Sequence, residues 1–146
     1  MRLDLPCKRF TISRMWLTTD ERIKWGCDFI GCPSIVDHLE NRLTVSNLPV
    51  GPPWLPRSLV QVLERDDPGM ILRSTGELPP ALKTKPILVL HGTNDQVVPW
   101  KVATDFIDHL AQQFNLVQVK LYKGVGHTMT PEMIDDFYDW LLEHIL

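Results

Sequence analysis

The clearest pattern of apolar and polar positions begins at residue 85. The segment PILVLH, residues 86–91, is a continuous apolar run, typical of a parallel strand that is covered on both faces. Residues 101–114 then place apolar side chains at helical spacing. Residues 116–122 alternate, which predicts a strand near a sheet edge. After Thr130, an expected N-cap, and Pro131 in the first turn, an apolar stripe predicts a closing helix, while its acidic residues are expected on a solvated face.

The pattern before residue 85 predicts one strand and two helices. Residues 23–31, IKWGCDFIG, have the composition of a strand, and PSIVDHLENRL predicts a helix with Ser34 as its N-cap. The stretch LPRSLVQVLERDD predicts a second helix that ends before Pro68. The order strand, helix, helix, strand, helix, strand, helix indicates an α/β layered fold with a parallel sheet.

Composition narrows the class of protein further. The chain has 146 residues, 44% apolar and 23% charged, with a net charge of −3, as expected for one globular domain. No basic run suggests a nucleic-acid partner, and no apolar run approaches the length of a membrane span or a secretory signal. Three cysteines, an odd count, favour a reducing, cytoplasmic location.

Two residues stand where an α/β sheet places chemistry. Asp95 follows the strand at 86–91, and His127 follows the strand at 116–122, in the loop KGVGHTM. Ligands of open α/β sheets bind beyond the carboxyl ends of the strands, so both side chains are expected on one rim. An acid that orients a histidine is half of a nucleophile–base–acid arrangement. Singly, each has an ordinary interpretation: Asn94-Asp95 suits a turn, and His127 suits a polar loop.

The stretch HGTNDQVVP, followed by GVGH and a closing amphipathic helix, resembles the C-terminal part of an α/β-hydrolase. The nearest group is the prolyl-oligopeptidase-like (peptidase S9) and carboxylesterase-type serine hydrolases. The resemblance implies a partial α/β-hydrolase fold of about three parallel strands, with flanking helices and a cap-like insertion. It implies Asp95 as the triad acid and His127 as the general base, in the chain order of that fold. Small-molecule esters or peptides are the implied substrates, with no cofactor.

The resemblance also divides the chain into three parts. Residues 1–22 form an atypical N-terminal segment, interpreted as the remnant of the helix after the nucleophile. Residues 23–84 hold a strand and the cap-like insertion, and residues 85–146 form the C-terminal hydrolase segment. The insertion contains apolar residues expected either to line a pocket or to pack in the ordinary way: Trp54, Leu55, Leu59, Val62 and Leu63.

A nucleophile is not recognisable. The fold places it in a Gly-x-Ser-x-Gly turn, and no serine before Asp95 has both glycines: Ser13, Ser34, Ser46, Ser58 and Ser74. Cys32 is followed by Pro33, which has no N–H for an oxyanion, and Cys7 is crowded by Pro6, Lys8 and Arg9. We therefore expect a truncated chain with an incomplete triad and little activity. We also expect the strand at 86–92 to have an uncovered edge that favours self-association.

Other functions are weighed against this hypothesis. A non-catalytic pseudoenzyme or interaction module would use the uncovered strand edge and the proline-rich segment 49–56. A nucleotide site is disfavoured because GVGHTM lacks the third glycine. A metal site made of His91, Asp95 and His127 lacks the usual close ligand spacing. His91 is expected to be structural, and three histidines within helices are expected at the surface: His38, His109 and His144.

Overall fold

The computed structural model describes residues 20, 22–32, 34–78 and 80–144. Three strands form one parallel sheet in the order β1 (Gly26–Phe29), β2 (Ile87–Gly92), β3 (Val117–Tyr122). Between β1 and β2 lie α2 (Ile35–Val45), α3 (Arg57–Asp66), α4 (Pro68–Thr75) and the short helix η1 (Pro80–Leu82). α5 (Trp100–Gln113) joins β2 to β3, and α6 (Pro131–His144) closes the chain. The predicted α/β fold with about three parallel strands and flanking helices is confirmed.

β2 is the central strand, and all six of its residues are buried. It pairs with β1 on one side, from Gly26 opposite Ile87 to Phe29 opposite Leu90, and with β3 on the other. The expectation that the strand at 86–92 has an uncovered edge is therefore wrong. Within the described residues, the edges of the sheet belong to β1 and β3, and β3 is the edge strand that the alternation at 116–122 predicts.

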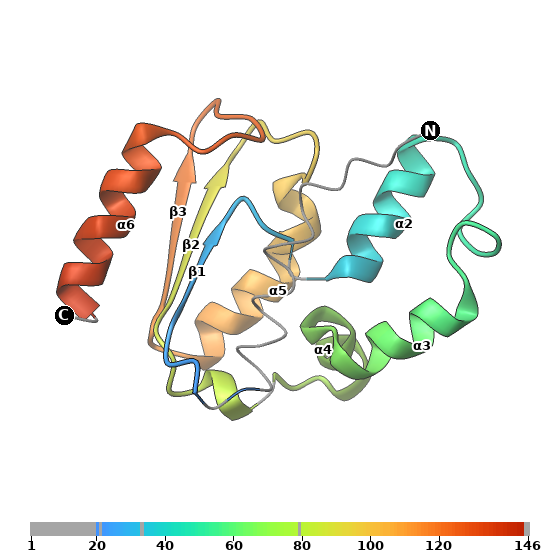
Figure 1. Cartoon of the computed structure of the whole chain (residues 1–146), viewed down its shortest axis with the longest axis horizontal. Coiled ribbons are helices and arrows are strands. Elements are labelled where there is room, and N and C mark those ends of the chain that lie inside the picture. The colour runs from blue at the N-terminus through green and yellow to red at the C-terminus, as the bar shows by residue number, and fades with distance from the viewer. Residues whose placement is uncertain (1–19, 21, 33, 79, 145–146) are drawn as a thin grey trace.

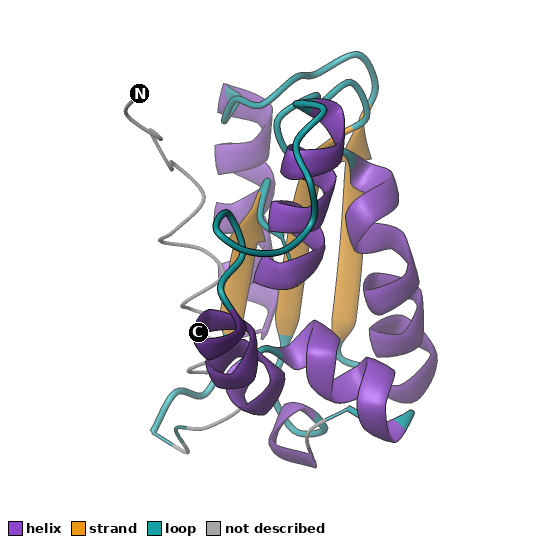
Figure 2. Ribbon diagram, turned by 90° about the vertical axis from the view of Figure 1, so that its right-hand side faces the viewer, coloured by secondary structure: helices purple, strands orange, loops and turns teal. Residues whose placement is uncertain are grey.

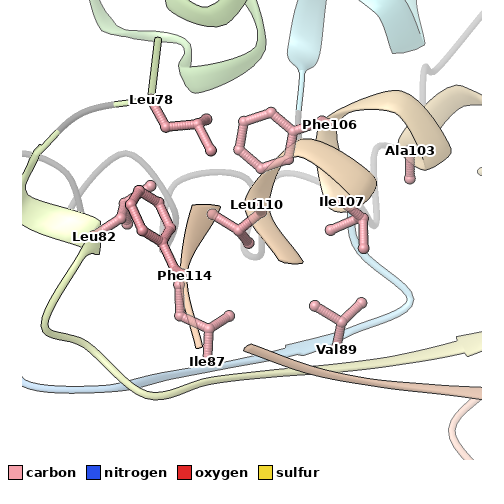
Figure 3. Close-up of a cluster of buried hydrophobic side chains, with 9 residues drawn as sticks. All are labelled: Leu78, Leu82, Ile87, Val89, Ala103, Phe106, Ile107, Leu110 and Phe114. Atoms are coloured by element: carbon pink, nitrogen blue, oxygen red, sulfur yellow. The ribbon is translucent and has the colours of Figure 1, made fainter. Parts of the chain in front are cut away.

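Helices cover both faces of the sheet, and successive residues of β2 contribute to opposite cores (Figures 1 and 2). Ile87 and Val89 pack against the apolar stripe of α5, in a cluster that Phe106, Ile107 and Leu110 dominate (Figure 3). Leu88 and Leu90 face α6, in a cluster with Tyr122, Met133 and Trp140. This two-sided burial explains why the sequence of β2 is a continuous apolar run without alternation.

The predicted helix starts are confirmed at both positions. The Ser34 hydroxyl accepts a hydrogen bond from the Asp37 N–H at 3.2 Å, and the Thr130 hydroxyl accepts one from the Met133 N–H at 3.2 Å. Pro131 is the first residue of α6. Local capping chemistry therefore sets where α2 and α6 begin.

Sequence reasoning missed α4. The predicted stop before Pro68 is confirmed, because α3 ends at Asp66. Pro68 also occupies the first turn of the next helix, where its missing N–H costs no hydrogen bond. Asp67 caps α4 by accepting the N–H groups of Gly69 and Met70 at 2.9 and 3.2 Å. The same buried carboxylate accepts the N–H of Ile35, the first residue of α2, at 2.5 Å. Asp67 thus joins two helices that are distant in sequence.

The edge strand β3 is attached to α6 by a polar cluster. The Tyr122 hydroxyl donates to the Asp136 carboxylate at 2.5 Å, and Lys120 forms an ion pair with the same carboxylate. Asp136 therefore differs from Asp135 and Asp139, which are exposed as expected for a solvated face. In the described part of the chain, no helix combines the length and the apolar composition needed to cross a membrane.

Candidate active site

Asp95 lies in the turn that leaves the carboxyl end of β2. One carboxylate oxygen, Oδ1, accepts the backbone N–H groups of Val97 and Val98 at 2.8 and 2.9 Å. This is the side-chain-to-backbone bonding that makes Asp a turn residue. The side chain is fully buried. The turn therefore holds the carboxylate in one orientation and leaves its second oxygen, Oδ2, for another partner.

The loop that carries His127 is bonded directly to the Asp95 turn. The N–H of Asn94 donates to the Val125 carbonyl at 2.9 Å, and the N–H of Gly124 donates to the Thr93 hydroxyl at 2.9 Å. Gly92, the last residue of β2, lies against the same loop so closely that an added Cβ would be 2.2 Å from the Val125 oxygen. Adjacent parallel strands thus bring the two loops together at their carboxyl ends.

The structure brings the two predicted site residues into contact, although they are 32 residues apart. His127 Nδ1 lies 2.8 Å from Asp95 Oδ2. Because a carboxylate can only accept, Nδ1 is the donor, and in the neutral imidazole the lone pair then lies on Nε2. The His127 side chain retains 19% of its exposure, whereas Asp95 retains none. The arrangement is a buried acid that orients a partly open imidazole, and the free Nε2 suits it to accept a proton.

His38 is a buried neighbour of this pair, so the expectation that it lies at the surface is wrong. It is on the first turn of α2 and is only 6% exposed, because this turn of α2 faces the protein interior. Burial lowers the pKa of His38, electrostatic interactions with Arg42 and His127 add to this effect, and the negative charge of Asp95 opposes it. His109 is exposed as expected, and His144 is partly buried. No sequence signal indicated which helix face would carry His38 inward.

Among the described serines and cysteines, we observe none whose hydroxyl or thiol is hydrogen-bonded to His127. Cys32 is fully buried and its thiol donates to the Ser34 carbonyl at 2.9 Å. Ser34 is also buried, and its hydroxyl caps α2. The Ser74 hydroxyl donates to the Ile71 carbonyl within α4. The candidates Cys7 and Ser13, and nearly all of the predicted segment 1–22, lie outside the described residues.

A cleft of about 520 Å³ lies between α2, α4 and α5, away from the acid and the histidine. Its lining includes Arg73, Lys101 and Phe106 but neither Asp95 nor His127. The five apolar residues of the insertion that were weighed as a pocket lining do not line it either. Leu55 and Leu63 are buried in ordinary packing, and Trp54, Leu59 and Val62 are exposed.

Known proteins resemble this chain in sequence and in fold. Residues 72–146 match the sequence model of the prolyl oligopeptidase family. A search of curated proteins found no match. Among solved structures, the chain is similar to TT1662 from Thermus thermophilus, with a TM-score of 0.55 and 22% identity over 91% of this chain and 49% of that one.

Two further solved structures are similar to this chain in fold. The Pyrococcus furiosus esterase PF2001 is similar with a TM-score of 0.54 and 17% identity, over 91% of this chain and 49% of that one. The acyl-protein thioesterase 2 of Zea mays is similar with a TM-score of 0.52 and 19% identity, over 94% of this chain and 51% of that one. The three structures have the α/β-hydrolase fold, and this chain spans about half the length of each.

Proposed function

The chain belongs to the prolyl oligopeptidase family of serine hydrolases, and from this premise we propose that Asp95 and His127 are the acid and the general base of an acyl-transfer triad. The observation that carries the proposal is the 2.8 Å contact between His127 Nδ1 and Asp95 Oδ2. The carboxylate is buried, and its other oxygen accepts hydrogen bonds from two backbone N–H groups, so the carboxylate is held in one orientation. A purely structural role of Asn94-Asp95 in a turn would not require the contact between Asp95 and His127.

In the proposed reaction, His127 Nε2 removes the proton from a nucleophile hydroxyl as that oxygen attacks the carbonyl carbon of an ester or peptide bond. The same proton then passes to the leaving group, and the acyl group is transferred to water in a second round. A positioned general base contributes about 10²- to 10⁴-fold to such a step. Asp95 holds the tautomer in which Nε2 has its lone pair toward the reaction. Small esters or short peptides are the proposed substrates, and the odd cysteine count supports a cytoplasmic location.

We extend the proposal to the nucleophile: this chain by itself has weak hydrolase activity or none. The support is the absence of a Gly-x-Ser-x-Gly sequence before Asp95. Cys32 and Ser34 are buried and already engaged in hydrogen bonds. Labelling by a fluorophosphonate probe and turnover of p-nitrophenyl acetate test this directly, with His127→Ala as the control. Labelling of a serine that disappears in His127→Ala would overturn the proposed inactivity, although it would support the role of His127.

The acid–base pair is tested independently of activity by the tautomer of His127, read from the ¹⁵N shifts of its ring. We expect Nδ1–H in the wild type. In Asp95→Asn the amide oxygen must still accept from Val97 and Val98, so the NH₂ group faces His127 and drives it to the Nε2–H tautomer. The exposed His109 serves as an internal control that stays unchanged. A wild-type His127 with its proton on Nε2 would refute the proposed pair.

A second candidate function is a non-catalytic interaction module, which the edge strand β3 favours. Val119 and Leu121 are 36% and 45% exposed along it. Within the described residues, β3 pairs only with β2. An exposed apolar edge strand is a template for association. Sedimentation velocity tests this: Val119→Lys is expected to reduce association more than Gln118→Lys, which adds the same charge to the opposite face. A wild type that stays monomeric at all concentrations contradicts this candidate.

A further inference from the structure

His91 is a fully buried imidazole at the carboxyl end of β2, four residues before Asp95. Its Nε2 lies 2.9 Å from the carbonyl oxygen of Val98. A carbonyl can only accept a hydrogen bond, so Nε2 must carry the proton. The ring also packs against Trp100, the first residue of α5, with 5.2 Å between the ring centroids. Both contacts fix the ring in one orientation.

The bond from His91 closes a chain of contacts that ends at His127. His91 donates to the carbonyl of Val98, and the N–H of Val98 donates to Asp95 Oδ1. Asp95 Oδ2 then accepts from His127. Val98 is fully buried and packs against Cys32, so the far side of the turn is held as well. The central strand, which is the most buried part of the sheet, thereby holds both ends of the Asp95 turn.

His91 also contributes an electrostatic contact. Its Nε2 lies 3.6 Å from Asp95 Oδ2, the oxygen that accepts from His127. This distance is too long for a hydrogen bond. It nevertheless places the positive end of an N–H dipole beside the carboxylate, in a region where both side chains are fully buried and screening by water is weak. The contact favours the orientation in which Oδ2 faces the two imidazoles.

We propose that His91 is a positioning residue for the acid–base pair: through the Val98 carbonyl it sets the Asp95 turn so that Oδ2 meets His127. The inference rests on the proposed function and adds a third side chain to it, one that acts through Asp95 and does not contact the reacting atoms. The competing interpretation is that the imidazole only fills space beside Trp100. The two interpretations differ in whether the N–H or the ring shape matters.

Two variants separate these interpretations. His91→Phe keeps an aromatic ring against Trp100 but has no donor, and His91→Gln offers an amide N–H without the ring. The readout is the His127 Nδ1 proton, observed by ¹⁵N-edited NMR on the full chain. We expect the signal to be lost to exchange in His91→Phe and to be retained in His91→Gln. Leu110→Ala, a core change on the α5 side, is the control: it lowers stability but leaves the signal in place.

The outcomes also separate this inference from the proposed function. A wild type without the Nδ1 proton signal would mean that the pair does not form, and the proposed function fails. A wild type with the signal, together with a His91→Phe variant that retains it, overturns the role of His91 alone. Where the Phe variant does not fold, hydrogen exchange in the wild type decides. We expect the His91 Nε2 proton to exchange no faster than the amide of Val98, whereas faster exchange would overturn the inference.

Discussion

Gly92 offers the sharpest test of how the site is held together. In Gly92→Ala, the new Cβ would lie 2.2 Å from the oxygen and 2.7 Å from the carbon of the Val125 carbonyl, and 2.8 Å from the Gly126 oxygen. These are backbone atoms that cannot rotate away. To reach the 3.4 Å of ordinary contact, the 125–126 backbone must move by 3.4 − 2.2 = 1.2 Å relative to β2.

The cost of this movement follows from the contacts that it breaks. Overpacking of a buried position costs about 1–3 kcal/mol. Losing the hydrogen bond from the Asn94 N–H to the Val125 carbonyl adds about 1 kcal/mol. We therefore expect Gly92→Ala to lower the free energy of unfolding by about 2–4 kcal/mol. His127 follows Val125 by two residues, and a 1.2 Å shift directly away from Asp95 would lengthen the 2.8 Å contact to 4.0 Å, beyond a hydrogen bond.

The assay combines urea denaturation, followed by tryptophan fluorescence and circular dichroism, with the NMR signal of the His127 Nδ1 proton. Gly126→Ala is the matched control in the same loop, because a Cβ there would meet only the Asn94 oxygen, at 3.8 Å. We expect the control to keep both stability and the signal. A Gly92→Ala variant that matched Gly126→Ala in both measurements would refute the reasoning, since it would mean that the loop accommodates the methyl group freely.

Three further predictions concern buried polar groups. Asp67→Ala should lower the free energy of unfolding in urea by about 2–4 kcal/mol, because three backbone N–H groups lose their acceptor. Asp66→Ala, which removes only a surface ion pair with Arg65, should lower it much less, and equal losses in the two variants would contradict this role of Asp67. Burial lowers the pKa of His38 below its ordinary value of 6.5. The contribution of His38 to stability is therefore complete above pH 6.5 and is lost as the pH falls through its pKa in the folded state. Urea midpoints measured between pH 8 and 5 should fall less steeply in His38→Leu than in the wild type. Burial and the contact with Asp136 raise the pKa of Tyr122 above 10.0, so the stability of the wild type should decline as the pH rises past 10. If Tyr122→Phe lost stability above pH 10 as steeply as the wild type does, this explanation would be wrong.

Much of the fold followed from local patterns. Residues 86–90 are apolar without interruption because β2 is buried on both faces, and the helical spacing at 101–114 reflects one face of α5 packed on the sheet. Ser34 and Thr130 were correct N-caps because capping involves residues only three positions apart. α4 was missed because Pro68 is equally a stop signal for one helix and a start signal for the next.

The candidate site was predicted only in part. Asp95 and His127 were identified from their neighbours in sequence and their order in the chain. Their contact at 2.8 Å depends on β2 and β3 pairing in parallel register, which brings together loops 32 residues apart. His38 was misplaced because a helix of 11 residues with a weak apolar stripe does not reveal which face will be covered.

What the sequence by itself determined is therefore most of the elements, and it singled out the two loop residues proposed as the acid and the base, because periodicity, caps and turn residues act over a few positions. Only the tertiary structure decided that β2 is central, that Gly92 touches the His127 loop, and that His91 meets the Val98 carbonyl beside the Asp95 turn. Strand order and the side on which a helix is covered depend on contacts between distant residues. Their energies come from burial against partners that a local pattern does not specify.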